Sequence, residues 1–69
     1  MNYEVIAIPI PASAQEAERL EQWLEGVANI GGELISVAPT QSSTRMLCIF
    51  RVRQPGSATR NAPPGSSRF

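Results

Sequence analysis

Apolar residues along the chain fall into three strand-like runs and one stretch with helical spacing. The strand-like runs cover residues 3–8, 33–38 and about 45–53, and they are rich in Val, Ile and other residues favoured in sheets. Pro9 ends the first run and Pro39 the second, because proline cannot donate the backbone N–H that a strand ladder needs. The pattern therefore predicts the element order strand, helix, strand, strand.

The helix is predicted over residues 14–29. Ser13 and Glu16 have the spacing of a capping box, in which the hydroxyl accepts from a first-turn amide and the carboxylate accepts from the N–H of the capping residue. The Gly31-Gly32 pair supplies the left-handed conformation that ends a helix. Apolar positions three or four residues apart predict one buried face, with Trp23 at its border; they are Ala17, Leu20, Leu24, Val27 and Ala28.

These elements predict an α+β fold: a single βαββ domain over residues 1–53, with a three-stranded, mainly antiparallel sheet and one helix on one face. The third strand is the longest and most apolar, so we expect it at the centre of the sheet, between the other two. Residues 54–69 are half Pro, Gly and Ser, and such a segment buries too little surface to offset its ordering entropy. We expect them to form a disordered tail.

Both faces of this sheet carry apolar side chains. In the third strand the even-numbered positions from 46 to 52 are all apolar, and the odd-numbered ones mix arginines with leucine and isoleucine. One helix covers one face, so the other is predicted to be an interface formed by Ile6, Ile8, Ile35, Val37, Leu47 and Ile49. A second copy of the chain is the simplest cover, which predicts a homodimer or a larger even assembly. The alternative is that the tail or a loop of the same chain buries this face.

The charge inventory narrows the chemistry. The 69 residues contain six Glu and six Arg, with no His, Asp or Lys, so the formal net charge is zero. This balance argues against electrostatic capture of nucleic acid or of an anionic membrane. A single cysteine, Cys48, cannot form an intrachain disulfide, and without His it predicts no zinc site and no cofactor. The chain has no basic leader and no long apolar run, and we expect a cytoplasmic protein.

Catalytic groups are scarce. Glu is the sole residue type suited to acid–base catalysis at neutral pH, so we expect a protein that is not an enzyme. Cys48 lies between two apolar residues, with no His to activate it, and is expected in the core. Glu4 and Glu33 share strand parity with the predicted interface, so we expect them on the same surface as the arginines, either as ordinary cross-strand ion pairs or as part of a pocket.

Three arginines on one side of the third strand are the strongest candidate for a binding site, because a guanidinium fork matches the paired acceptors of phosphate or carboxylate. The loop over residues 40–44 adds hydroxyl donors. The predicted ligand-binding set is Arg45, Arg51, Arg53, Glu33, Thr40, Ser42 and Ser43. The alternative is that arginines near strand ends protect a sheet edge from aggregation.

The segments YEVIAIPIP, LEGVANIGGELISVAP and MLCIFRVR resemble a family of small bacterial and phage βαββ domains of unknown function. That family has a Gly-Trp-Glu-Leu-Val-x-Val segment and a closing strand that ends in Phe-Lys-Arg. Over residues 3–53 its pattern falls on Gly31, Glu33, Leu34, Ile35, Val37, Ile49, Phe50 and Arg51, whereas Gly32 stands where the family has Trp. The resemblance implies the βαββ fold and a tendency to self-associate, and it implies no catalytic residue.

These features together predict a non-enzymatic, homo-oligomeric binding module that acts through its sheet face and the loop over residues 40–44. A first alternative is an oligomeric small-molecule sponge, of the kind a phage accessory protein provides, that traps an anionic or nucleotide-like ligand between subunits. A second alternative is weak nucleic-acid binding, which rests on the arginines of the third strand and of residues 54–69.

Overall fold

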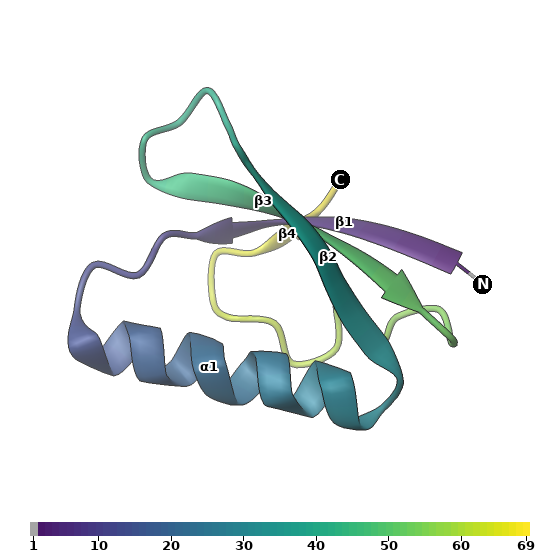
Figure 1. Cartoon of the computed structure of the whole chain (residues 1–69). Coiled ribbons are helices and arrows are strands. Elements are labelled where there is room, and N and C mark those ends of the chain that lie inside the picture. The colour runs from purple at the N-terminus through teal and green to yellow at the C-terminus, as the bar shows by residue number, and fades with distance from the viewer. Residues whose placement is uncertain (1) are drawn as a thin grey trace.

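The computed structural model describes residues 2–69, in which one helix packs against one face of a twisted sheet (Figure 1). The elements in chain order are β1 (Asn2–Pro9), α1 (Ala14–Asn29), β2 (Gly32–Pro39), β3 (Arg45–Val52) and β4 (Ser67–Arg68). Neighbouring strands are antiparallel, in the order β2-β3-β1-β4. The predicted α+β class, the βαββ order and the central place of the third strand are confirmed, and β4 is an addition that the sequence pattern did not predict.

Helix α1 begins and ends where the local signals place it. The Ser13 hydroxyl accepts from the N–H of Glu16 at 3.2 Å, which confirms the N-terminal cap. The Glu16 carboxylate accepts from the N–H of Ala12 at 2.7 Å instead of the expected N–H of Ser13, so the return bond is made one residue earlier. At the other end Gly31 takes a φ of 91°, in the left-handed region that favours glycine.

The register of β1 on β3 decides which side chains share a face. Even-numbered residues of β1 lie opposite even-numbered residues of β3, with Ile6 opposite Cys48 and Ile8 opposite Met46. Both isoleucines therefore lie on the face that packs against α1, and they are 1% and 0% exposed. The prediction that Ile6 and Ile8 belong to an uncovered interface is wrong, because this register makes them core residues.

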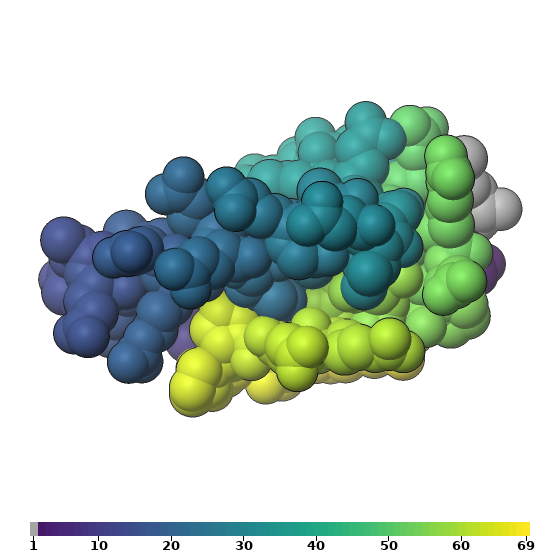
Figure 2. All heavy atoms as spheres, turned by 90° about the horizontal axis from the view of Figure 1, so that it is seen from below, coloured from purple at the N-terminus to yellow at the C-terminus, as the bar shows by residue number. Residues whose placement is uncertain are grey.

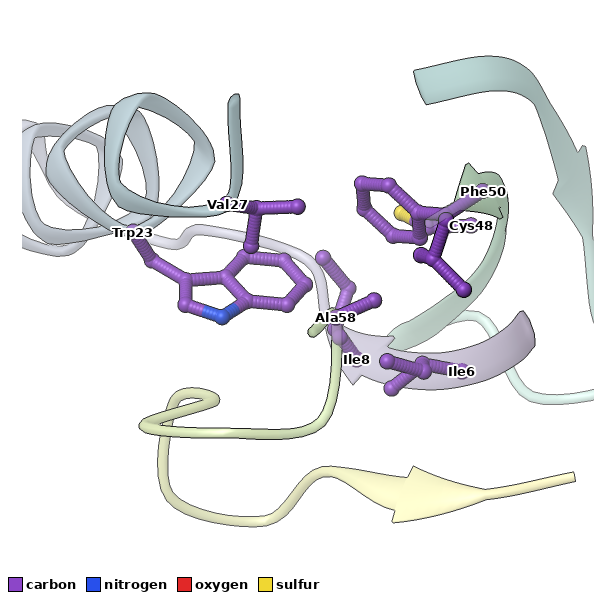
Figure 3. Close-up of a cluster of buried hydrophobic side chains, with 8 residues drawn as sticks. Ile6, Ile8, Trp23, Val27, Cys48, Phe50 and Ala58 are labelled. Carbon is purple, nitrogen blue, oxygen red and sulfur yellow. The ribbon is translucent and has the colours of Figure 1, made fainter. Parts of the chain in front are cut away.

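The core lies between α1 and the sheet (Figure 3). The Trp23 ring meets the Phe50 ring edge to face, with centroids 5.5 Å apart and planes at 75°, a geometry worth about 0.5–1.5 kcal/mol beyond area burial. Trp23, predicted at the border of the apolar stripe, is thus at its centre, whereas Ala17 and Ala28 are exposed. The buried cluster, in which Cys48 was predicted, consists of Ile6, Ile8, Trp23, Val27, Cys48, Phe50, Val52 and Ala58.

Residues 54–69, which we call the strap, lie alongside α1 on the same side of the sheet (Figure 2). Ser57 and Ala58 are 2% and 0% exposed, and β4 pairs with β1, with Arg68 opposite Ile6. The structure therefore differs from the expected disordered tail. The strap offers few apolar side chains, and the polar contacts described below hold it in place.

The face of the sheet away from α1, which we call the open face, has no helix over it (Figure 1). Its β3 residues are the odd-numbered ones, among them Leu47 and Ile49, which are half-buried. On β2 the residue Ile35 is a bulge, because Leu34 lies opposite Phe50 whereas Ser36 lies opposite Ile49. The bulge reverses the alternation, so Val37 lies opposite Cys48 on the α1 side instead of on the predicted open face.

Candidate functional site

The structure divides the predicted ligand-binding residues between two ends of β3. Arg45 lies at one end, beside the loop with Thr40, Ser42 and Ser43, and Arg51 lies near the other end, opposite Glu33. Arg45 and Arg51 are six residues apart on the strand, about 20 Å at the usual rise of a β-strand. Arg45 therefore does not converge with the other two arginines within a single chain, whereas Arg51 and Arg53 line one hollow of about 260 Å³ together with Glu33. Each end has to be considered by itself.

Arg45 is occupied by its own chain. Its guanidinium donates to the carbonyl of Ala7 at 3.2 Å, to the carbonyl of Gly65 at 3.1 Å and to the hydroxyl of Ser67 at 2.7 Å. These three bonds join β3, β1 and the strap. Arg45, one of the three arginines predicted to bind an anion, thus holds the end of the strap in place.

Arg51 is paired with Glu33, as the sheet register places them opposite one another. The hydrogen bond that Arg51 donates to the Glu33 carboxylate, together with the charge of that carboxylate, raises the pKa of Arg51. Both side chains are largely exposed, and the pair is electrically neutral as a unit. The prediction of an ion pair between Glu33 and one of the strand arginines is confirmed. Arg53 is the neighbouring arginine, and the aliphatic part of its side chain packs against Gly31.

The loop between β2 and β3 is closed by its own hydroxyl groups. The Thr40 hydroxyl donates to the carbonyls of Ser42 and Arg45 at 2.9 Å each, and the Ser42 and Thr44 hydroxyls lie 2.9 Å apart. Ser43 is exposed. A hollow of about 560 Å³ adjoins the loop on the open face, with Leu47 in its lining. The hydroxyls that were expected to receive a ligand are used to fix the shape of the loop.

Glu4 has a role that sequence reasoning missed. Its side chain is 1% exposed, and its two carboxylate oxygens accept from the N–H groups of Gly56 at 3.0 Å and Ala58 at 2.9 Å. The Arg68 guanidinium lies 3.4 Å from the same carboxylate. Glu4 faces the core side of β1, opposite Phe50, and not the open face where we expected it. We call this arrangement the Glu4 clamp: one buried carboxylate, two strap amides and one strap arginine.

A signal for the Glu4 clamp was present in the sequence. Glu4 is the one charged residue of the first strand and shares parity with Ile6 and Ile8, whose register makes them core residues. A buried carboxylate requires partners, because an unpaired one is costly in a low-dielectric interior. The partners are backbone amides of a segment more than 50 residues away in the chain, and amides carry no sequence signature.

The outer edge of β2 is the part of the sheet left uncovered. We call Leu34, Ile35 and Val37 the β2 strip; they are 40%, 50% and 50% exposed. No strand pairs with this edge among residues 2–69. Leu34 and Val37 of the strip lie opposite Phe50 and Cys48, whereas Ser36 and Ala38 between and beside them lie opposite the half-buried Ile49 and Leu47 of the open face. Tyr3 is 65% exposed on the open face. Exposed apolar side chains on a free strand edge are typical of a protein interaction surface.

Groups with catalytic or metal-binding chemistry do not gather in the part of the chain described. Burial of Cys48 raises the pKa of its thiol, which keeps the sulfur protonated at neutral pH. Residues 2–69 hold no cluster of three His, Cys, Asp or Glu side chains able to bind a metal ion. Over the same residues, no helix has the length and apolar character needed to cross a bilayer.

Comparisons with known proteins returned no match: no protein-family model, no curated protein and no solved structure is similar to the chain. The resemblance to small βαββ domains therefore stays a prediction. In this fold Gly32, which stands where that family has Trp, is packed so closely that a Cβ atom would lie 2.3 Å from a methyl group of Val27. A side chain at position 32 has no space in this arrangement.

Proposed function

We propose that this protein is a non-enzymatic binding module that works as a homo-oligomer, with the β2 strip and the adjoining open face as the surface where copies meet. The observation that carries the proposal is the exposure of Leu34, Ile35 and Val37 on an unpaired strand edge. The β2-β3 loop lies at one end of this surface and supplies a polar rim.

A second copy is the occupant that fits this surface best. From Leu34 to Pro39 the edge carries no charged side chain, so two such edges meet without repulsion and without burying an ion. An antiparallel strand pair about a two-fold axis would satisfy the free N–H and C=O groups of both edges at once. Apolar side chains project from both sides of β2, because the bulge at Ile35 reverses the alternation there.

The size of the chain favours assembly too. A domain of about this length buries only about 60% of the surface of its unfolded chain, which leaves its stability marginal without a metal, disulfide or partner subunit. A standard interface takes about 800 Å² from each partner, roughly a sixth of the 4663 Å² that the single chain exposes.

Among the alternatives, the small-molecule sponge remains a prediction that no contact in the chain favours. Arg45 is held by the strap and Arg51 by Glu33, so neither is free for an anion. Nucleic-acid binding would require exposed cations near exposed aromatic rings. Arg51 lies opposite the exposed Tyr3 but its charge is balanced by Glu33, so this arrangement does not favour that reading.

Sedimentation velocity or light scattering at about 10–100 µM protein tests the proposal through Ile35→Lys. A charge placed in an apolar interface lacks a partner and is expected to weaken association by tenfold or more. Gln15→Lys is the matched control, because it adds the same charge at an exposed position on α1. The wild-type chain and Gln15→Lys are expected to assemble at concentrations where Ile35→Lys is monomeric.

A wild-type chain that stays monomeric at 100 µM would disprove the homo-oligomer. Equal assembly of Ile35→Lys and Gln15→Lys would show that copies meet elsewhere and not at the β2 strip. Circular dichroism of both variants distinguishes loss of assembly from loss of folding, since Ile35 is half exposed and contributes little to the core.

A further inference from the structure

The strap is held to the body by specific polar contacts but by little apolar surface. Its buried apolar anchor in the core is Ala58, and Ala62 packs beside the cluster. Three buried polar atoms have no hydrogen-bond partner within residues 2–69: Trp23 Nε1, Arg45 Nε and Ser66 Oγ. Each lies on the strap or on a side chain that contacts or adjoins it. Unsatisfied buried donors and acceptors are costly, so the docked strap is weakened at its own contact surface.

The docking site itself is strongly specified. It consists of the outer edge of β1, the buried Glu4 carboxylate and the Arg45 guanidinium. When the strap leaves, Glu4 loses both amide donors and the core loses Ala58. An empty site would therefore combine an unpartnered carboxylate with exposed apolar surface, and both are unfavourable. The site is therefore unfavourable when empty, whereas a strap from the same chain or from another chain can fill it.

When the strap leaves it takes β4 with it, and the pairing of β1, β2 and β3 does not depend on it. Arg53, which joins the strap to β3, and the first two strap residues, 54 and 55, are exposed, and contacts of the strap with Glu4 and Arg45 connect segments 20 to 54 residues apart in sequence. Such contacts form equally well between two chains, because nothing in them depends on the link through residues 53–55. This is the condition for exchange of a segment between identical copies.

We propose that β1, Glu4 and Arg45 form a strand-docking site that the strap fills within its own chain or, reciprocally, from a second copy. The partner copy then supplies the two amides and Arg68 to Glu4, and Ser67 to Arg45, with the same partners as in the single chain. The proposal does not rest on the β2 strip, which lies at the opposite edge of the sheet.

The balance between the two states depends on concentration. A segment on a short flexible linker has an effective concentration of about 1 mM for its own site. Exchange is therefore expected to involve a minor fraction of molecules at about 10 µM and a large fraction near 1 mM. Trapping the exchanged state by a covalent bond makes this fraction measurable.

Cysteine cross-linking between Ala7→Cys and Ser67→Cys chains tests the proposal, because Ala7 and Ser67 are register partners of β1 and β4. Ala7 is 5% exposed, so a thiol at this position is reached by a strap docked in register and poorly by random collision. The two single variants are mixed at about 1 mM each under mild oxidation. The expected product is a mixed disulfide between position 7 of one chain and position 67 of the other, identified by peptide mass, with yield falling steeply on dilution to about 10 µM.

Three controls make every result decisive. The double variant Ala7→Cys/Ser67→Cys at about 10 µM is expected to close a disulfide within one chain, and failure to close would contradict the docking site itself. If the double variant closes but the mixture yields only disulfides between two Ser67→Cys chains, exchange is disproved. The wild-type chain controls for Cys48, which is buried. Repeating the mixture with Ile35→Lys in both chains is expected to leave the yield unchanged, which separates this proposal from that of the β2 strip.

Discussion

The two outer edges of the sheet differ in how they are closed. At the β1 edge, the two-residue strand β4 and the rest of the strap cover the backbone, and the residues beneath, such as Ile6, are fully buried. At the β2 edge, an eight-residue strand carries Ile35 and Val37 half exposed, with no strand beside it among residues 2–69. The strongly apolar edge is thus left open, and a largely polar segment closes the other.

The difference shows what kind of interaction each edge can make. The β1 edge recognises its cover through a buried carboxylate and an arginine, so the choice of occupant is specific and depends on hydrogen-bond geometry. The β2 edge offers backbone groups and apolar side chains, which fit a second apolar edge without requiring particular partners. The β1 edge is therefore suited to specific docking, and the β2 edge, at the opposite end of the strand order, is suited to general self-association.

Glu4→Ala is expected to have the largest effect, because it removes the acceptor of the Gly56 and Ala58 amides and leaves both donors unsatisfied. At about 1–3 kcal/mol per buried unsatisfied group, the free energy of unfolding should fall by about 3 kcal/mol, with Tm lower by about 15 °C. Denaturant and thermal melts followed by circular dichroism measure the loss.

Glu18→Ala is the matched control for this carboxylate, since Glu18 is exposed on α1, and its effect should stay within about 0.5 kcal/mol. Equal melts for Glu4→Ala and Glu18→Ala would mean that the strap contributes nothing to stability through Glu4. The β1 edge would then be no better closed than the β2 edge, and the contrast between them would disappear.

Gly32→Ala is expected to have an intermediate effect at the start of the open edge. The new methyl group would lie 2.3 Å from Val27 Cγ1, so β2 has to move away from α1 at this contact. Overpacking of this kind costs about 1–3 kcal/mol. Gly26→Ala is the control: nothing lies within 4 Å of its added methyl, and alanine in a helix should stabilise the protein by up to about 1 kcal/mol.

Opposite signs for these two glycine substitutions in urea melts would show that β2 packs tightly against α1 at Gly32. If Gly32→Ala is as stable as the wild type, β2 yields at this contact without cost and is held mainly by its pairing with β3. Its exposed strip would then be a mobile edge and not a preformed surface.

Local rules account for most of the fold. Ser13, Gly31 and Pro39 mark boundaries through effects within a few residues, which is why α1 begins at Ala14 and ends at Asn29 as predicted. Parity along a strand fixes which side chains share a face, but not which face is covered. That choice came from the β1 register, and it placed Ile6 and Ile8 in the core.

The parts that the sequence could not supply depend on distant partners. The bulge at Ile35 places Val37 on the other face, and the sequence has no Gly or Pro at that position to indicate a bulge. The strap has the composition of a disordered segment, and its order comes from backbone amides that meet Glu4 more than 50 residues away. A prediction of disorder from composition considers only the side chains that a segment can bury. It therefore misses a segment that is ordered by hydrogen bonds of its backbone amides.

Cys48 lies on the central strand β3, opposite Ile6 on β1 and Val37 on β2, so its thiol has the closed edge on one side and the open edge on the other. Burial of this side chain, which is 2% exposed, raises the pKa of its thiol above the ordinary value of 9.0. Below pH 9 the thiol is protonated in both folded and unfolded chains. Above it the unfolded chain releases the proton first, so the folded chain holds more protons and the free energy of unfolding falls as pH rises.

This is the smallest of the three effects, and it is measured as the difference between wild type and Cys48→Ala in urea melts from about pH 8 to about pH 10.5. The difference cancels the contributions of groups that both chains share. A stability advantage of wild type that declines above pH 9 is the expected result. A difference that stays constant across this range would mean that the thiol has the same pKa in the folded and unfolded chains, so that the folded sheet does not shield Cys48 from water.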